Sequence, residues 1–195
     1  IYEILERCYT TRSGLVTIIT NANRPLTESK TFNELVVPNK TRTQIVVSLD
    51  GIKVINDKQR LFSKFDVVVG NIQNLQDEGF LVTISHTLTS INLAYVYEFL
   101  EFLNERGWLF HERFSLIATP ASHTQPHLVT DAISDDDLRH ANENFFKIAS
   151  LHDQHPNPGV CTALDRVLTV QHDLLSRRLK NDTVVHRPVR SNPPG

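Results

Sequence analysis

The sequence predicts an α/β protein built on parallel strands, arranged as a doubly wound sheet or as a whole or partial (β/α) barrel. Four apolar runs of strand character, at 15–20, 44–49, 80–88 and 108–118, begin about 30 residues apart. Helix-like stretches lie between these runs, and two of them end at Gly79 and Gly107. Because strands and helices that alternate at this spacing form parallel sheets, we expect a doubly wound sheet or a whole or partial barrel.

The helices are predicted from their own patterns. Residues 27–36 have Thr27 at the N-cap position, and residues 62–78 lead up to Gly79. Residues 92–106 have an apolar face at three- and four-residue steps, made of Leu93, Val96, Tyr97, Leu100 and Leu103. Residues 1–12 predict another helix, with Ile1, Ile4, Leu5 and Cys8 on one face. The first strands of the barrel are therefore expected upstream of this sequence.

Three regions are expected along the chain. Residues 1–122 are predicted to form the C-terminal part of the barrel, 123–182 a loop and helical extension, and 183–195 a Pro-rich disordered tail. Within the extension, residues 133–153 predict a helix capped by Ser134, the segment QHPNPG at 154–159 ends that helix, and residues 164–180 predict one more.

Composition excludes several classes of protein. A net charge of -2 and a pI near 6.5 provide no basic stripe for nucleic acid. No apolar run approaches the roughly 20 residues of a membrane span, and the N-terminus has no signal-peptide pattern, so the expected location is cytoplasmic. Because the chain begins at Ile1 and contains no Met, it is expected to be a fragment of a longer protein.

Each predicted strand ends in small hydrogen-bonding side chains: Thr20 and Asn21, then Ser48 and Asp50, then Ser85, Thr87 and Thr89, then Thr119. The carboxyl ends of parallel strands meet at one edge of a sheet, where ligands bind. These residue types suit a polar small molecule with hydroxyl, amine and carboxylate groups. The alternative interpretation is that they are ordinary strand-terminating and capping residues.

Five motifs lie in order along residues 15–120: Thr20-Asn21, Ser48-Leu49-Asp50-Gly51, Asp57 to Arg60, Asn71-Ile72 through Gly79, and Thr89 to Asn92. In order and spacing they resemble the core domain of radical S-adenosylmethionine (radical SAM) enzymes, in the sulfatase-maturing and peptide-modifying (SPASM-type) branch. The resemblance implies a partial (β/α) TIM-like barrel that holds S-adenosylmethionine across the carboxyl ends of its strands.

The resemblance also implies roles for individual residues. Ser48 would hydrogen-bond the methionyl or ribose part of S-adenosylmethionine, and Arg60 would face its carboxylate. Asp50 would orient Arg60 or a ribose hydroxyl. The implied cofactor-binding set is Asn21, Ser48, Asp50, Arg60, Ser85, Thr87 and Thr119; no catalytic residue and no metal ligand is assigned within this sequence.

The sequence departs from the family pattern at three points. It lacks the CxxxCxxC motif that holds a four-iron four-sulfur cluster and the Gly-Gly-Glu-Pro stretch, and it has Ala22 where the family has Gly. The cluster ligands are expected upstream of Ile1. The resemblance implies that the full-length enzyme, with its cluster and a reductant, generates a 5'-deoxyadenosyl radical that modifies a peptide or protein substrate, whereas this fragment alone is inactive.

Two alternative functions stay open. One is a catalytically inactive, radical SAM-like binding module without the cluster. The other is an unrelated α/β-barrel hydrolase or aldolase, which would need a nucleophile-base pair or a strand-end lysine. The lysines near the strand ends are Lys53 and Lys58, both predicted in exposed loop.

Several residues also have purely structural interpretations. Arg60 could form a surface ion pair with Asp57, three residues before it. Cys8 and Cys161 are read as small buried residues, since two distant thiols cannot hold a cluster. His86 is predicted to point to the helix side of the sheet as a hydrogen-bonded core histidine.

Overall fold

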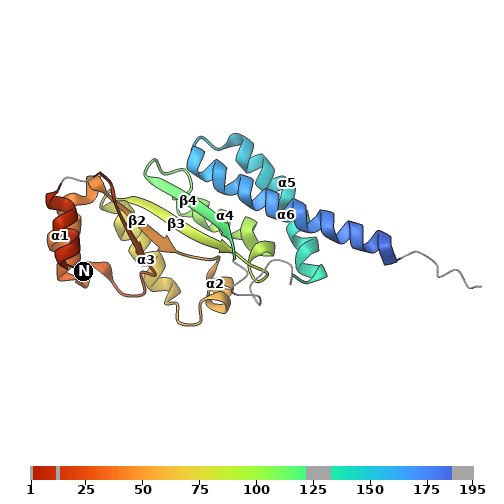
Figure 1. Ribbon diagram of the computed structural model, residues 1–195, viewed down its shortest axis with the longest axis horizontal. Helices are drawn as coiled ribbons and strands as arrows, with labels where there is room; N and C mark the ends of the chain where they lie inside the picture. The colour runs from red at the N-terminus through yellow and green to blue at the C-terminus, as the bar shows by residue number, and fades with distance from the viewer. Residues whose placement is uncertain (1, 12–13, 122–132, 186–195) are drawn as a thin grey trace, which may run out of the picture.

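The computed structural model describes residues 2–11, 14–121 and 133–185. Its centre is a parallel sheet of four strands, β1 (Val16–Thr20), β2 (Thr43–Ser48), β3 (Leu81–Leu88) and β4 (Phe114–Pro120), in the order β1-β2-β3-β4. Each strand lies beside the strand that precedes it in the chain (Figure 1). The predicted α/β class with parallel strands is therefore confirmed, and all the strands end at one edge.

The two faces of the sheet differ in what covers them. Val47 and Ile84 are fully buried in a core shared with α3 (Phe65–Asp77), α4 (Val96–Glu105) and α6 (Pro158–Val185). On the opposite face Ile19 is 75% exposed and Ile117 is 44% exposed. When successive strand-helix-strand connections have the same handedness and each strand is added beside the one before it, their helices lie on the same face of the sheet. The other face therefore stays accessible toward the strand ends.

Most helices lie where the sequence predicts them. They are α1 (Tyr2–Thr10), α3, the 3-10 turn η4 (Leu93–Tyr95) that leads into α4, α5 (Asp135–Gln154) and α6. Ser134 caps α5 as predicted, because its Oγ accepts the N–H of Asp137 at 3.1 Å. Among the described helices, none combines the length and apolar character needed to cross a membrane.

The helical extension shares the core of the sheet. Leu138 and Ile148 of α5 and Leu164 of α6 belong to the same buried cluster as the strands. Figure 1 shows α5 and α6 as a pair beside β4. The helix α6 begins earlier than predicted because Asn157 Oδ1 accepts the N–H of Gly159 at 2.9 Å. It continues through Val185, past residue 182, and residues 186–195 lie outside the described part.

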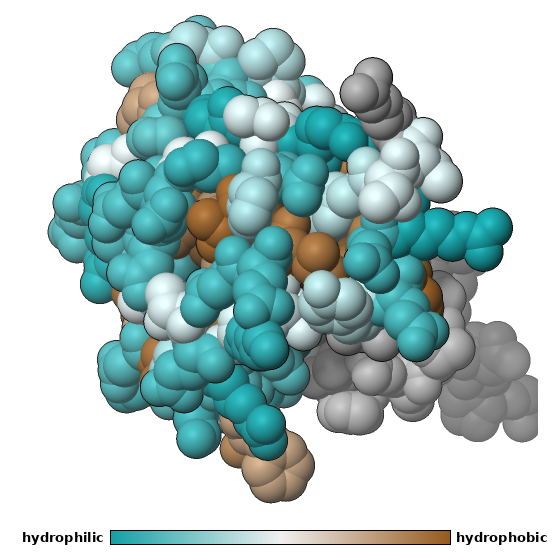
Figure 2. Space-filling model, turned by 90° about the vertical axis from the view of Figure 1, so that its left-hand side faces the viewer, coloured by the Kyte–Doolittle hydropathy of each residue, from teal (hydrophilic) through white to brown (hydrophobic). Residues whose placement is uncertain are grey.

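Hydrophobic surface is limited on the end of the molecule that carries α1. Figure 2 shows it as an area near the middle of this face, surrounded by hydrophilic side chains. The predicted apolar face of α1 is partly wrong: Ile4 is 66% exposed, whereas Tyr9 is buried and its hydroxyl lies 3.0 Å from Thr43 Oγ1. Leu5 packs against the core as predicted. The tyrosine hydroxyl therefore anchors α1 to the start of β2.

The predicted start of the fourth strand is wrong. Residues 108–113 form turns, and β4 begins only at Phe114. Trp108 and Leu109 are buried, and Trp108 Nε1 donates to Gln73 Oε1 at 2.9 Å, which pins the turn to α3. An apolar run looks the same in sequence whether it is buried as a strand or as a turn.

The predicted helix at 27–36 is also wrong as a continuous α-helix. The chain forms a 3-10 turn (Leu26–Glu28), a π-helix (Phe32–Val36) and a second 3-10 segment (Val37–Arg42). Thr27 lies inside the first turn and does not cap a helix. Pro38 has no N–H to donate, so a regular α-helical hydrogen-bond pattern cannot continue through it.

Asn71 of α3 holds the loop that follows β1. Its Nδ2 donates to the carbonyl oxygens of Ala22 and Arg24, at 2.8 and 2.7 Å, and its Oδ1 accepts the N–H of Leu26 at 3.1 Å. The Asn71 side chain and Ala22 are both buried, so little water could replace the amide at the Ala22 carbonyl. One residue thus ties the carboxyl end of β1 to α3.

We expect Asn71→Ala to lower the free energy of unfolding by about 2–4 kcal/mol, because it leaves buried backbone groups unpaired. Asn74→Ala, on the exposed face of the same helix, is the matched control and should change stability by no more than about 0.5 kcal/mol. Urea unfolding followed by circular dichroism measures both, and equal small effects would contradict the anchoring role.

Candidate functional site

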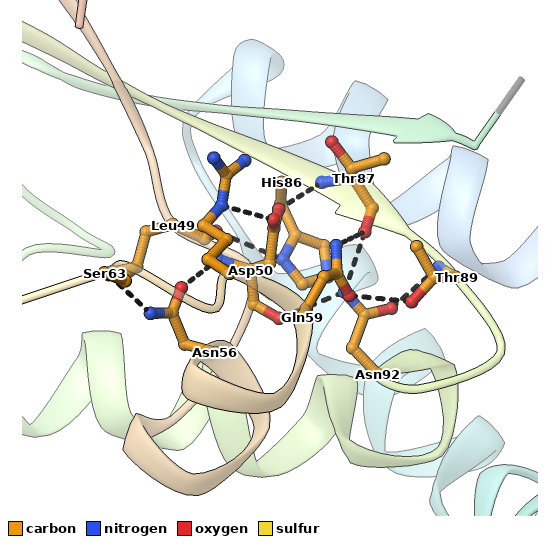
Figure 3. A network of polar contacts seen from close by, with 10 residues as sticks. Leu49, Asp50, Asn56, Gln59, Ser63, His86, Thr87, Thr89 and Asn92 are labelled. Carbon is orange, nitrogen blue, oxygen red and sulfur yellow. Dashed lines mark hydrogen bonds and ion pairs between the residues drawn. The ribbon is translucent and has the colours of Figure 1, made fainter. Parts of the chain in front are cut away.

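Asp50 is the centre of a polar network at the carboxyl end of β2 (Figure 3). Its side chain is 1% exposed. Oδ1 accepts the backbone N–H of Thr87 at 2.7 Å, and Oδ2 accepts the Nε–H of Arg60 at 2.5 Å. The carboxylate therefore joins the ends of β2 and β3 to the end of the following helix.

The turn after Asp50 brings Arg60 back to the strand. Gly51 has a φ of 145°, and a Cβ there would lie 3.1 Å from Ile55 Cγ2, so the position requires glycine. The chain then enters α2 (Lys53–Gln59), whose start is held by Asn56: its Oδ1 accepts the N–H of Asp50 at 3.0 Å. Arg60 follows directly after α2 and faces Asp50.

A second set of amides joins the ends of β2 and β3 (Figure 3). Asn92 Nδ2 donates to the carbonyl oxygens of Asp50 and Thr87, at 3.0 and 2.7 Å, while its Oδ1 accepts the N–H of Thr89 at 2.8 Å. Gln59 Nε2 donates to the Thr87 carbonyl at 3.2 Å, and its Oε1 accepts the Thr89 hydroxyl at 2.7 Å. The two amide side chains thus provide hydrogen-bond partners for backbone groups where β2 and β3 end.

Arg60 lines a hollow at the edge of the sheet. The hollow has a volume of about 240 Å³ and is lined by Asn21, Asn23, Arg60, Leu61, Phe62 and Ser63. The Arg60 side chain is 31% exposed, and among the described residues its Nη groups have no hydrogen-bond partner. A guanidinium that is oriented through Nε and has free Nη groups can receive a carboxylate in a bidentate manner.

The other predicted residues lie along the same edge. Ser48 and Ser85 are paired across β2 and β3, and Thr87 and Thr119 are paired across β3 and β4. The serines are partly exposed, and their hydroxyls have no partner among the described residues. Asn21 lines the hollow with Arg60. The predicted residues therefore share one strand edge, with Asp50, Thr87 and Arg60 in direct contact.

The predicted alternative of a surface pair between Arg60 and Asp57 is wrong. Asp57 lies 3.8 Å from Lys53 Nζ, and Arg60 pairs with Asp50 instead. The expectation that Lys53 and Lys58 lie in loop is also wrong, because both are on α2. A hydrogen bond to Asp66, at 2.8 Å, raises the pKa of Lys53 and keeps it an ammonium.

His86 lies on the helix side of the sheet, as predicted. It is buried, its Nδ1 lies 3.3 Å from the carbonyl oxygen of Leu49, and its ring stacks on Phe99 with centroids 4.9 Å apart. Burial lowers the pKa of His86 from its ordinary value of 6.5, because the imidazolium would lose its hydration. The histidine is therefore a neutral part of the core beneath Asp50.

Sequence reasoning missed the supporting amides Asn56 and Gln59. They lie three positions apart on α2, so they fall on the same helix face as each other, and Asn56 is fully buried. A polar pair at helical spacing directly after Asp50-Gly51 was the available signal. Ala22 is buried with a φ of 50°, a left-handed conformation that strains a residue with a Cβ.

Other parts of the molecule offer less to a ligand of this kind. A hollow of about 250 Å³ between α4 and α5 is lined by Tyr97, Glu101, Lys147 and neighbouring residues. None of the predicted cofactor-binding residues lines it. Cys8 and Cys161 are partly buried, lie on α1 and α6, and are not joined by a disulfide. Among the described residues no cluster of three or more His, Cys, Asp or Glu side chains could hold a metal ion.

Comparisons of the chain with protein-family models, with curated proteins and with solved structures found no match. The fold and site by themselves define a class: an α/β protein with a parallel sheet whose carboxyl edge carries an oriented arginine beside a polar hollow. Its more particular function is argued from that chemistry below.

We expect the stability of the protein to fall as the pH is lowered below about 6.5, in part because of His86. The unfolded chain binds a proton at the ordinary pKa, whereas the buried imidazole takes one up only at lower pH. A difference of one bound proton between the unfolded and folded states changes the free energy of unfolding by at most about 1.4 kcal/mol per pH unit in this window. Urea unfolding of the wild type and of His86→Phe across the window measures it; equal pH dependence in the two proteins would contradict this role.

Proposed function

We propose that the strand edge binds S-adenosylmethionine and that this chain is the cofactor-binding part of a radical SAM enzyme acting on a peptide or protein. The observation that carries the proposal is Arg60, which a buried carboxylate orients beside a hollow at the carboxyl ends of parallel strands. Four of the five motifs lie at or beside this edge, and in the fifth Asn71 holds the loop that follows β1.

The chemistry of the edge suits this ligand. The carboxylate of the methionyl part would receive the Nη groups of Arg60, since a guanidinium presents parallel donors to a carboxylate. The hydroxyls of Ser48 and Ser85 lie on neighbouring strands and would serve the methionyl or ribose part. Asn21 would line the carboxylate end, and Thr87 and Thr119 the ribose and adenine side.

The fold is consistent with the wider proposal of a partial (β/α) barrel. The strands follow one another without a reversal of order, and the helices cover one face. A doubly wound sheet would reverse its strand order and place helices on both faces. The accessible face, with Ile19 and Ile117, would then be the interior of the barrel.

The iron-sulfur cluster does not fit the residues of this chain. Its three thiolate ligands require a CxxxCxxC motif, whereas Cys8 and Cys161 lie on separate helices. The cluster ligands are proposed to lie elsewhere in the full-length protein, and no chemical step through the cluster is derived for these residues.

A second candidate is a binding module with the same ligand site but without cluster chemistry. It is favoured by the network around Asp50, in which Thr87 and Arg60 satisfy both carboxylate oxygens from protein contacts alone. An aldolase-type function is disfavoured, because a Schiff-base lysine needs a lowered pKa, whereas the pKa of Lys53 is raised.

We expect Arg60→Ala to weaken S-adenosylmethionine binding about 10- to 100-fold, by removing a charge-assisted pair. Arg60→Lys retains the positive charge without the bidentate geometry, so it should lose less affinity for S-adenosylmethionine than Arg60→Ala does. Binding of 5'-methylthioadenosine, which has no carboxylate, should not change. Isothermal titration calorimetry measures both ligands, with Arg166→Ala, an exposed arginine of α6, as the matched control.

If Arg60→Ala folds normally but loses binding of both S-adenosylmethionine and 5'-methylthioadenosine, the proposed pairing of Arg60 with the carboxylate is contradicted. If the wild-type protein does not bind S-adenosylmethionine, the proposed site is overturned. Ser48→Ala should weaken S-adenosylmethionine binding about fivefold. Formation of 5'-deoxyadenosine from S-adenosylmethionine by the full-length protein, loaded anaerobically with iron and sulfide and supplied with a one-electron reductant, separates the enzyme from the binding module.

A further inference from the structure

Two adjacent large apolar side chains stand in solvent at the rim of the Arg60 hollow. Leu61 is 81% exposed and Phe62 is 89% exposed, and both line the hollow. Single exposed apolar residues are common on protein surfaces, whereas neighbouring ones beside a hollow mark a binding surface. Aromatic and aliphatic side chains of this kind are the usual anchors of protein interfaces.

The loop that carries this pair is held by hydrogen bonds. Asn23 Nδ2 donates to the carbonyl oxygen of Phe62 at 3.3 Å, and Asn23 Oδ1 accepts the N–H of Lys64 at 3.0 Å. Asn56 Nδ2 donates to the Ser63 hydroxyl at 3.0 Å, and the N–H of Ser63 donates to the Arg60 carbonyl at 2.9 Å. A rim that is ordered before binding loses little conformational entropy when a partner arrives.

The charges around the pair are basic. Arg24 and Lys64 are exposed and adjoin Asn23 and Ser63 of the hollow, and among the described residues neither has an ion pair. The nearby carboxylates are engaged, Asp50 by Arg60 and Asp66 by Lys53. A partner that covers Leu61 and Phe62 would therefore gain from acidic groups beside its apolar anchor.

We propose that Leu61, Phe62, Arg24 and Lys64 form a docking surface for an extended peptide in which a large apolar side chain is flanked by acidic residues. Resting on the proposed function, this names the substrate class, since such a peptide would lead to the strand edge. A peptide suits the surface better than a bilayer, because the apolar pair lines a concave hollow together with the exposed side chain of Asn21, whose amide can bind a peptide backbone.

Fluorescence anisotropy of a labelled pentapeptide, with one phenylalanine between two acidic residues on each side, tests the proposal with the wild-type chain and no nucleoside present. Phe62→Ser should weaken binding at least about tenfold. Phe146→Ser, which removes a phenylalanine 77% exposed on α5, is the matched control and should bind as the wild type does. A double charge reversal, Arg24→Glu with Lys64→Glu, should also weaken binding, and a peptide with lysines in place of its acidic residues should bind poorly.

Equal weakening by Phe62→Ser and Phe146→Ser would overturn the proposal, as would binding that is indifferent to the charge reversal. Phe62-dependent attachment to anionic lipid vesicles, or Phe62-dependent self-association in sedimentation, without peptide binding would also overturn it. A separate titration with S-adenosylmethionine alone distinguishes the failures: nucleoside binding without peptide binding refutes the docking surface and leaves the proposed function, and the reverse result refutes the proposed function alone.

Discussion

The buried carboxylate of Asp50 is the constraint on which the arrangement of this edge depends. A carboxylate removed from water is strongly destabilising unless it is paired and hydrogen-bonded. Here the N–H of Thr87 and the guanidinium of Arg60 satisfy both oxygens. Because these partners come from β3 and from the end of α2, the charge holds three separate segments in one geometry and orients Arg60 toward the hollow.

Amide side chains extend this order through the loops. Asn56, Asn92, Asn71 and Asn23 each use a donor and an acceptor to satisfy groups that the strand ladder leaves unpaired. Loops that leave a sheet carry such groups by necessity. Within the described part of the chain, the Nη groups of Arg60 and the hydroxyls of Ser48 and Ser85 have no hydrogen-bond partner.

The edge combines two chemistries within a short stretch of chain. The polar residues at the carboxyl ends of β2 and β3 are buried or partly buried, whereas Leu61 and Phe62 are apolar and exposed. In the proposed function the polar part receives a nucleoside with a carboxylate, and the apolar rim with its basic flanks receives the peptide. A single turn, Arg60 to Ser63, supplies groups to both, so nucleoside and peptide would meet at one place.

Local pattern was enough to predict β1, β2, β3, α4 and α5, because alternation in strands, three- and four-residue steps in helices and the Ser134 cap are properties of neighbouring residues. The same patterns wrongly predicted a strand at residues 108–113, which form turns, since a buried turn and a buried strand can have the same apolar composition. They also predicted a continuous helix at 27–36, where the extended backbone of Ser29 separates a 3-10 turn from a π-helix.

The sequence by itself determined the parallel α/β class and the gathering of Ser48, Asp50, Ser85, Thr87 and Thr119 at one edge, because parallel strands end together. Only the tertiary structure decided the partner of Arg60. Asp57 is closer along the chain, but the turn at Gly51 brings Asp50 against the guanidinium, and burial makes that pair the one that must form. The roles of Asn56 and Gln59 were likewise decided there, because the groups they bind belong to other segments.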